Sequence, residues 1–147
     1  MPVSLDPDSL DTWRAFLGAH SRLTQAIERD LEAAGVIPLT WYDVLYALHQ
    51  APGRCLRMHE LADAVVLSRS GLTRLVDRLH KAGLVQRERC PEDGRGQFAV
   101  LSRSGTAALR RAWPVYANSI REHFARLLTP ADARRLAKVF SAAGTPR

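Results

Sequence analysis

The sequence predicts a mainly α-helical fold with one small β-hairpin, and three observations support this prediction. Apolar residues recur at helical spacing over several long stretches. Two strand-like runs, residues 85–89 and 97–101, enclose the turn-forming stretch CPEDGRG. Two helical segments joined by a short break come directly before this hairpin. This order of elements predicts a winged helix-turn-helix domain.

The N-terminal part of the chain predicts two helices and a short strand. Asp6-Pro7 has the form of a helix cap followed by a proline at the first helical position, and this helix extends to Gly35. The stretch Thr40-Trp41-Tyr42-Asp43 has the form of a capping box, so a second helix is expected from Thr40 until Pro52-Gly53 ends it. Alternating polar and apolar residues at 54–57 predict an edge strand.

The middle of the chain predicts the helix-turn-helix and its wing. A helix is expected at residues 58–66, followed by a hinge at Leu67. Ser68 is expected to cap the next helix, which Gly83 ends, and the hairpin comes next.

The C-terminal part predicts two further helices. Residues 103–128 have one apolar face, and Pro114 predicts a kink in this helix. Thr129-Pro130-Ala131-Asp132 has the form of a cap that opens a last helix. The 147 residues are expected to form a single domain, because no internal repeat or low-complexity segment interrupts them.

The charge of the chain indicates a polyanionic partner. Its formal net charge is +6, although residues 1–53 carry three basic and seven acidic side chains. The excess of positive charge is confined to the rest of the chain, and residues 105–147 carry eight basic and two acidic side chains. Such a balance favours binding to nucleic acid.

Several other classes of protein are excluded by the sequence. No apolar run approaches the roughly 20 residues that span a bilayer, and the N-terminus is acidic, so we expect a cytoplasmic protein without a membrane partner. Cys55 and Cys90 lack CxxC spacing and the histidines lack HExxH spacing, so neither a metal nor another cofactor is expected. No catalytic triad, carboxylate pair or phosphate-binding loop is present, so we do not expect an enzyme.

The helix predicted after Leu67 carries the candidate contacts with double-stranded DNA. Helical spacing places its leucines, Val76 and Ala82 on one face. The opposite face of the helix carries basic and polar residues, and the ordinary explanation for such a face is that it is simply exposed to solvent. That side, however, combines hydroxyl and guanidinium groups, which can bond base edges and phosphates. The expected DNA contacts are Ser68, Arg69, Ser70, Thr73, Arg74 and Arg78.

The tip of the predicted hairpin carries two more candidate residues. Arg95 lies between two glycines at an extended tip, where an arginine can enter a minor groove. Asp93 either holds an arginine through a charge-assisted pair or simply forms the turn.

The chain resembles the MarR family of bacterial transcription regulators. The resemblance rests on the stretches LTWYDVLYALHQAPG, HELADAV, LSRSGLTRLVDRLHKAGLVQR and PEDGRGQFAVLS. It implies a winged helix-turn-helix part at about residues 38–102 and helical dimerisation parts at about 8–35 and 103–144. It also implies a homodimeric repressor that binds a pseudo-palindromic operator, with Arg95 as the wing-tip arginine and Asp93 as its partner. The chain departs from many relatives at Gly96, where they carry an arginine or a branched residue.

The resemblance further implies release from DNA by a small phenolic or anionic ligand. Its site would draw on aromatic and histidine side chains of three helices: Trp13, His20, Tyr42, Tyr46 and Trp113. Aromatic side chains at helical spacing are more often part of a core, so each of these residues has both interpretations open. Asp43 lies in a Trp-x-Asp-Val-Leu stretch similar to one in the urate-responsive branch, although a place near the helix start already accounts for it.

Two alternative functions remain open from the sequence. The domain could be a winged-helix module that binds another protein, with its basic face merely solvated. It could also be a thiol-based, redox-responsive repressor, because Cys90 lies beside Arg87 and Arg89, whose charges favour a reactive thiolate.

Overall fold

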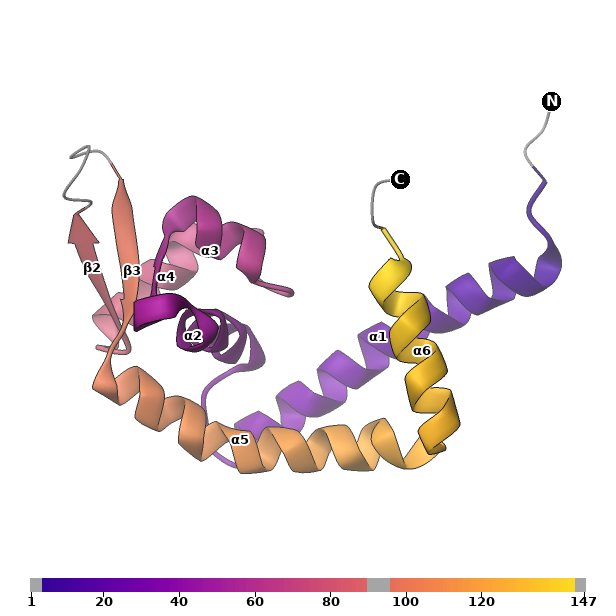
Figure 1. Cartoon of the computed structure of the whole chain (residues 1–147). Coiled ribbons are helices and arrows are strands. Elements are labelled where there is room, and N and C mark those ends of the chain that lie inside the picture. The colour runs from indigo at the N-terminus through magenta and orange to yellow at the C-terminus, as the bar shows by residue number, and fades with distance from the viewer. Residues whose placement is uncertain (1–3, 90–95, 145–147) are drawn as a thin grey trace. The chain divides into compact units, whose positions relative to one another are not determined.

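The computed structural model describes residues 4–89 and 96–144, and this part of the chain confirms the predicted, mainly helical fold class. Its helices are α1 (Pro7–Ala33), α2 (Leu39–Gln50), α3 (Met58–Ala64), α4 (Leu72–Lys81), α5 (Arg103–His123) and α6 (Pro130–Ala142). Its strands are β1 (Cys55–Arg57), β2 (Val85–Arg89) and β3 (Gln97–Leu101), and short 3-10 turns occupy Pro52–Arg54 and Ala125–Leu127 (Figure 1).

Contacts between residues divide the chain into two compact units. One unit, Leu31–Val115, contains α2 to α4, the three strands and the first part of α5, and we call it the winged unit. The other unit consists of Met1–Asp30 and Tyr116–Arg147, and we call it the terminal-helix unit. Both boundaries fall inside long helices, α1 and α5. The winged unit therefore extends beyond both ends of the winged helix-turn-helix part that is expected at about residues 38–102.

The winged unit is built on a small antiparallel sheet with the strand order β1-β3-β2. β2 and β3 pair from Val85 with Leu101 to Arg89 with Gln97, within the strand limits that the sequence predicts. β1 pairs with the other side of β3, so it is an edge strand, as expected. Helices α2, α3 and α4 pack on this sheet (Figure 1). The core that they share is formed by Val44, Leu45, Leu48, Leu61, Val76, Leu79, Val85 and Ala99, which are all fully buried.

The base of the hairpin is joined closely to the start of α5. Ser102 caps this helix, because its hydroxyl accepts from the Gly105 amide at 2.9 Å and donates to the Gly83 carbonyl at 2.7 Å. Gly105 lies so near the backbone that a Cβ there would be 2.2 Å from the Leu84 carbonyl oxygen. A glycine is therefore required where α5 crosses the start of β2.

The helix caps follow the sequence predictions at the starts of α1 and α6 and differ at the start of α2. Asp6 accepts from the Ser9 amide at the start of α1, and Thr129 and Asp132 form the predicted capping box of α6. The capping box expected at Thr40 is absent: α2 begins at Leu39, with Pro38 as its N-cap and no side-chain cap. The carboxylate of Asp43 bonds a distant segment instead, as described below. The fifth helix ends at His123, earlier than expected, because the backbone of Phe124 leaves the helical conformation.

The terminal-helix unit contains a polar connection between α1 and α5. The Ser119 hydroxyl donates to Asp30 at 2.5 Å, and His123 Nε2 lies 2.9 Å from the same carboxylate oxygen. These two hydrogen bonds, chiefly the one from Ser119, hold the pKa of Asp30 below its usual value of 3.8.

Large apolar side chains are exposed on the helices of this unit. Trp13 stacks on Phe16, and Phe16 contacts Phe140, yet all three rings are about half exposed. No residue of α6 is buried, and Val139 is 56% exposed.

Candidate DNA-binding surface

Helix α4 has one buried face and one basic face. Leu72, Leu75, Val76 and Leu79 are buried against the winged unit, as helical spacing predicts. Ala82, predicted on the same face, is exposed because it lies beyond the last helical residue. The opposite face exposes a hydroxyl, two guanidiniums and an amine, from Thr73, Arg74, Arg78 and Lys81.

The start of α4 differs from the prediction. The helix begins at Leu72, because the preceding Gly71 has a φ of +70°, a left-handed conformation that a glycine adopts without strain. Residues 68–71 therefore form a turn before the helix. Arg69 and Ser70 are exposed on this turn, whereas Ser68 is only 3% exposed. The Ser68 hydroxyl lies 3.1 Å from both the Thr40 carbonyl oxygen and Asp43 Oδ2, and it can donate its one proton to either. This residue therefore does not cap α4, and its buried side chain is not exposed for the predicted DNA contact.

Asp43 of α2 fixes this turn to the body of the winged unit. Its carboxylate accepts from the Leu67 amide at 2.7 Å and from the Val66 amide at 3.1 Å. The Ser68 hydroxyl lies 3.1 Å from the same carboxylate oxygen and can donate either to it or to the Thr40 carbonyl. Hydrogen bonds to an ionised acceptor are stronger than neutral ones. The carboxylate therefore sets the position of the residues that lead into the basic face. Sequence reasoning missed this role because the partners lie more than 20 residues away.

Arg69 is turned back toward α3. Its Nη2 lies 3.2 Å from Asp63 Oδ1, and its Nε donates to the Ala62 carbonyl at 3.1 Å. Both side chains of the ion pair are largely exposed, 69% for Arg69 and 77% for Asp63. An exposed pair of this kind contributes only about 0 to 1 kcal/mol, so a phosphate could displace Asp63 at small cost.

The stem of the wing is tied to α4 by a second ion pair. Arg87 of β2 lies 2.7 Å from Asp77 Oδ1 on the flank of α4. This pair occupies Arg87 within the protein and holds β2 beside the basic face. Three residues that the sequence singles out in the wing, Cys90, Asp93 and Arg95, lie outside the described residues.

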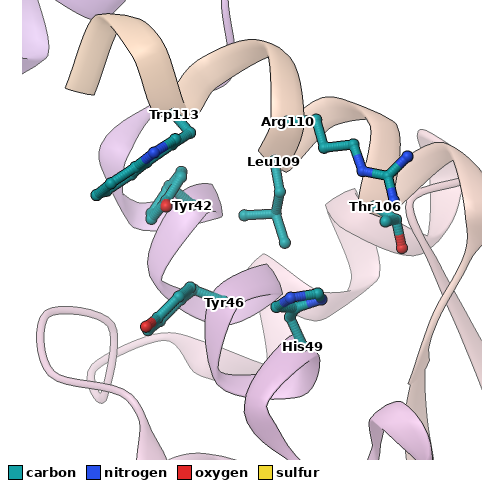
Figure 2. A pocket seen from close by; sticks show the side chains of 7 residues that line it. All are labelled: Tyr42, Tyr46, His49, Thr106, Leu109, Arg110 and Trp113. Carbon is teal, nitrogen blue, oxygen red and sulfur yellow. The ribbon is translucent and has the colours of Figure 1, made fainter. Parts of the chain in front are cut away.

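A cavity of about 420 Å³ lies between α2 and α5 within the winged unit. Its lining combines aromatic rings with a few polar groups: Tyr42, Tyr46, His49, Thr106, Leu109, Arg110 and Trp113 (Figure 2). The rings of Tyr42 and Tyr46 are stacked, with their centroids 5.9 Å apart. Three of the five predicted ligand residues, Tyr42, Tyr46 and Trp113, are thus brought together, along with His49 and Arg110. The volume suits a small organic molecule.

The other two predicted ligand residues belong to the terminal-helix unit. Trp13 and His20 are both exposed on α1, and neither is among the residues that line this cavity. His20 is therefore not buried in a core within the chain, whereas a place in a dimer interface stays a prediction.

The chain was compared with known proteins. A model described as MarR family matches residues 34–96. The structure is similar to the DNA-bound crystal structure of Sco3205, a MarR family transcriptional regulator from Streptomyces coelicolor, with a TM-score of 0.86. The two sequences are 35% identical, and the match covers 96% of this chain and 88% of the other. The chain belongs to the MarR family.

A second MarR family regulator and a curated transcriptional regulator are also similar to this chain. AbsC, a MarR family transcriptional regulator from the same organism, is 36% identical, has a TM-score of 0.82 and is covered over 92% of its chain and 93% of this one. The curated HTH-type transcriptional regulator YkoM of Bacillus subtilis is 25% identical over 92% of this chain and 86% of its own length. This MarR protein is accordingly a DNA-binding transcriptional regulator and not an enzyme. Along the described residues, no helix is both long enough and apolar enough to cross a membrane.

Proposed function

We propose that this MarR protein is a homodimeric repressor that reads a pseudo-palindromic operator and is released by a small ligand. The observation that carries the proposal is the exposed basic face of α4, fixed at its start by Asp43. A helix presented in this way can enter a major groove with its first turns against the base edges. The related Sco3205 was crystallised in complex with DNA, which supports the same role here.

The candidate contacts divide by their position. Thr73 and Arg74, on the first turn of α4, are proposed to reach base edges, because a guanidinium can bond a guanine through two donors. Arg78, one turn later, is proposed to contact the phosphate backbone. Arg69 and Ser70, on the turn before the helix, are proposed to contact phosphate, with Arg69 leaving Asp63 on binding.

The wing is proposed to contribute as the sequence indicates. Arg95 would enter the adjacent minor groove, and Asp93 would hold its conformation. Repression then follows if the operator overlaps a promoter.

DNA binding can be tested by selecting bound sequences from a random duplex pool and measuring affinity for the selected operator by gel shift. We expect Arg74→Ala to lose about 1 to 3 kcal/mol of binding free energy and to relax specificity at one base pair. Arg111→Ala is the matched control, because Arg111 is an exposed arginine on the part of α5 within the winged unit. Equal affinity of Arg74→Ala and wild type would show that Arg74 is not a base contact.

The homodimer is supported by the exposed apolar side chains of the terminal-helix unit. Monomeric proteins seldom expose several such residues on neighbouring helices. A groove of the same unit, lined mostly by apolar residues of α1 and of the segment after α5, includes Leu23, Ala26, Phe124 and Leu127. Analytical ultracentrifugation at micromolar concentration is expected to give the mass of a dimer, and a monomer would contradict this part of the proposal.

Ligand release is supported by the aromatic cavity. Tyr42, Tyr46 and Trp113 could stack on a phenolic ring, and Arg110 could pair with a carboxylate. Tyr42 lies next to Asp43 in α2, so a ligand that moves this helix would also move the turn before α4. A screen of small phenolic acids for operator release tests the idea. We expect an active acid to lose its effect on Trp113→Ala, and release that is unchanged in this variant would place the ligand elsewhere.

A further inference from the structure

A second cavity of the winged unit, of about 360 Å³, has a strongly basic lining. It lies where β3 leads into α5, at the end of the hairpin opposite the wing tip. Its lining residues are Arg54, Leu101, Ser102, Arg103, Thr106, Ala107 and Arg110. Three of these described residues are arginines, and none is acidic.

The positive charge of this cavity is not neutralised within the described part of the chain. None of the ion pairs between described residues includes Arg54, Arg103 or Arg110. Arg103 is also the first residue of α5, where the helix dipole places partial positive charge. Three arginines that line one hollow repel one another, and a bound anion would reduce this repulsion.

The backbone of Arg54 is held in a strained conformation at this place. It has a φ of +54°, and it is the one residue other than glycine with a positive φ in the described ranges 4–89 and 96–144. Strain of this kind persists only where the surroundings impose it, and it is frequent at binding sites. Here the Arg54 amide donates to the Ala51 carbonyl at 2.9 Å, and Nη1 donates to the Thr106 hydroxyl at 3.3 Å. The guanidinium is thereby fixed over the first turn of α5.

From these observations we propose that Arg54, Arg103 and Arg110 form a binding site for a phosphate group. Guanidinium forks match the oxygens of phosphate and bind it through paired hydrogen bonds. Arg110 and Thr106 also line the aromatic cavity, so the two cavities meet at these residues. The phosphate could therefore be free or carried by a small aromatic ester whose ring occupies the neighbouring cavity. The proposal concerns a small ligand and is independent of operator binding.

Isothermal titration calorimetry of the full chain without DNA tests this site. The probes are inorganic phosphate and phenyl phosphate, each added at an ionic strength held constant with sodium chloride. The double variant Arg54→Gln/Arg103→Gln is expected to bind both probes at least about tenfold more weakly, because it loses two charge-assisted contacts. Arg111→Gln, which removes an arginine outside the cavity, is expected to bind like wild type. The single variant Arg103→Gln, which breaks no described hydrogen bond, serves if the double variant does not fold.

The probes separate the two sources of phosphate. Tighter binding of phenyl phosphate than of inorganic phosphate, lost in Trp113→Ala, identifies an aromatic ester as the ligand class. Equal binding of the two probes identifies a free phosphate site. No binding by wild type at millimolar concentration overturns the proposal, as does equal binding by wild type and the double variant. A double variant that loses operator affinity but keeps phosphate binding would also overturn it, by making these arginines contacts to the DNA backbone.

Discussion

Replacing Asp43 by alanine should destabilise the turn before α4 and weaken DNA binding. The carboxylate accepts hydrogen bonds from the Val66 and Leu67 amides, and the Ser68 hydroxyl lies 3.1 Å both from it and from the Thr40 carbonyl oxygen. In the variant, water can reach the two amides, since Val66 is 84% and Leu67 37% exposed. Each of these two amide bonds should then contribute about 0.5 to 1 kcal/mol. The Ser68 hydroxyl keeps a partner in the variant, because it can donate to the Thr40 carbonyl. The expected loss of unfolding free energy is therefore about 1 to 2 kcal/mol.

The effect on DNA binding should exceed what reduced stability alone produces. Without Asp43 the turn must be ordered on binding, and fixing the backbone of a single residue costs about 1 to 2 kcal/mol. Operator affinity should fall about tenfold at temperatures where the variant remains folded. Urea denaturation gives the stability, and a gel shift with the selected operator gives the affinity.

Two other variants make this prediction specific. Asp43→Asn keeps one acceptor oxygen and the side-chain volume. Its free energy of unfolding and its operator affinity should therefore lie between those of wild type and of Asp43→Ala. Asp63→Ala removes an exposed partner of Arg69 and should lower the free energy of unfolding by at most about 1 kcal/mol. If Asp43→Ala lost no more stability than Asp63→Ala and bound the operator normally, the carboxylate would not hold the turn.

Three more predictions concern other parts of the chain. Gly105→Ala should lower the free energy of unfolding, measured by urea denaturation, by about 1 to 3 kcal/mol, because its Cβ would collide with the Leu84 backbone. Ser104→Ala, at the exposed neighbouring position, should leave the free energy of unfolding unchanged. Since hydrogen bonds from α5 depress the pKa of Asp30, its contribution to stability is present above pH 3.8 and is lost as the pH falls through the depressed value. Asp30→Asn should flatten that part of a pH-stability curve, and an unchanged curve would contradict the assignment. If the proposed homodimer covers Val139, which is 56% exposed in the single chain, Val139→Glu should raise the dimer dissociation constant at least about tenfold by ultracentrifugation, because an unpaired carboxylate would be buried. An unchanged constant would place Val139 outside the interface.

The elements that the sequence predicts well are those fixed by neighbouring residues. The strands at 85–89 and 97–101 were bounded correctly, because turn-forming residues stand between them and the pairing is set by the hairpin itself. The caps at Asp6 and Thr129 were also correct, since each bonds an amide three residues away. Such contacts depend only on local geometry.

The same four-residue pattern forms a different structure where a distant segment bonds its aspartate. Thr40 to Asp43 and Thr129 to Asp132 have the same T-x-x-D form, yet only the second pair forms a capping box. The carboxylate of Asp43 instead meets two amides and a hydroxyl from residues 66–68, which reach it only after α3 has packed on α2. A pattern of four residues contains no information on that packing. The predicted cap at Ser68 fails for the same reason, since its hydroxyl lies beside the same carboxylate.

The candidate DNA-binding surface shows how far residue type alone can identify function. Among the basic residues of the helix-turn-helix and the wing stem, Arg69 and Arg87 are paired with aspartates. Within the described part of the chain, Arg74 and Arg78 take part in no ion pair and are exposed on one face of α4. Helical spacing predicted that shared face, but not which arginines would be paired, because pairing depends on where α3 and β2 come to lie beside α4. The free energy of DNA binding should therefore be concentrated at Arg74 and Arg78, whereas Arg69 must first leave Asp63.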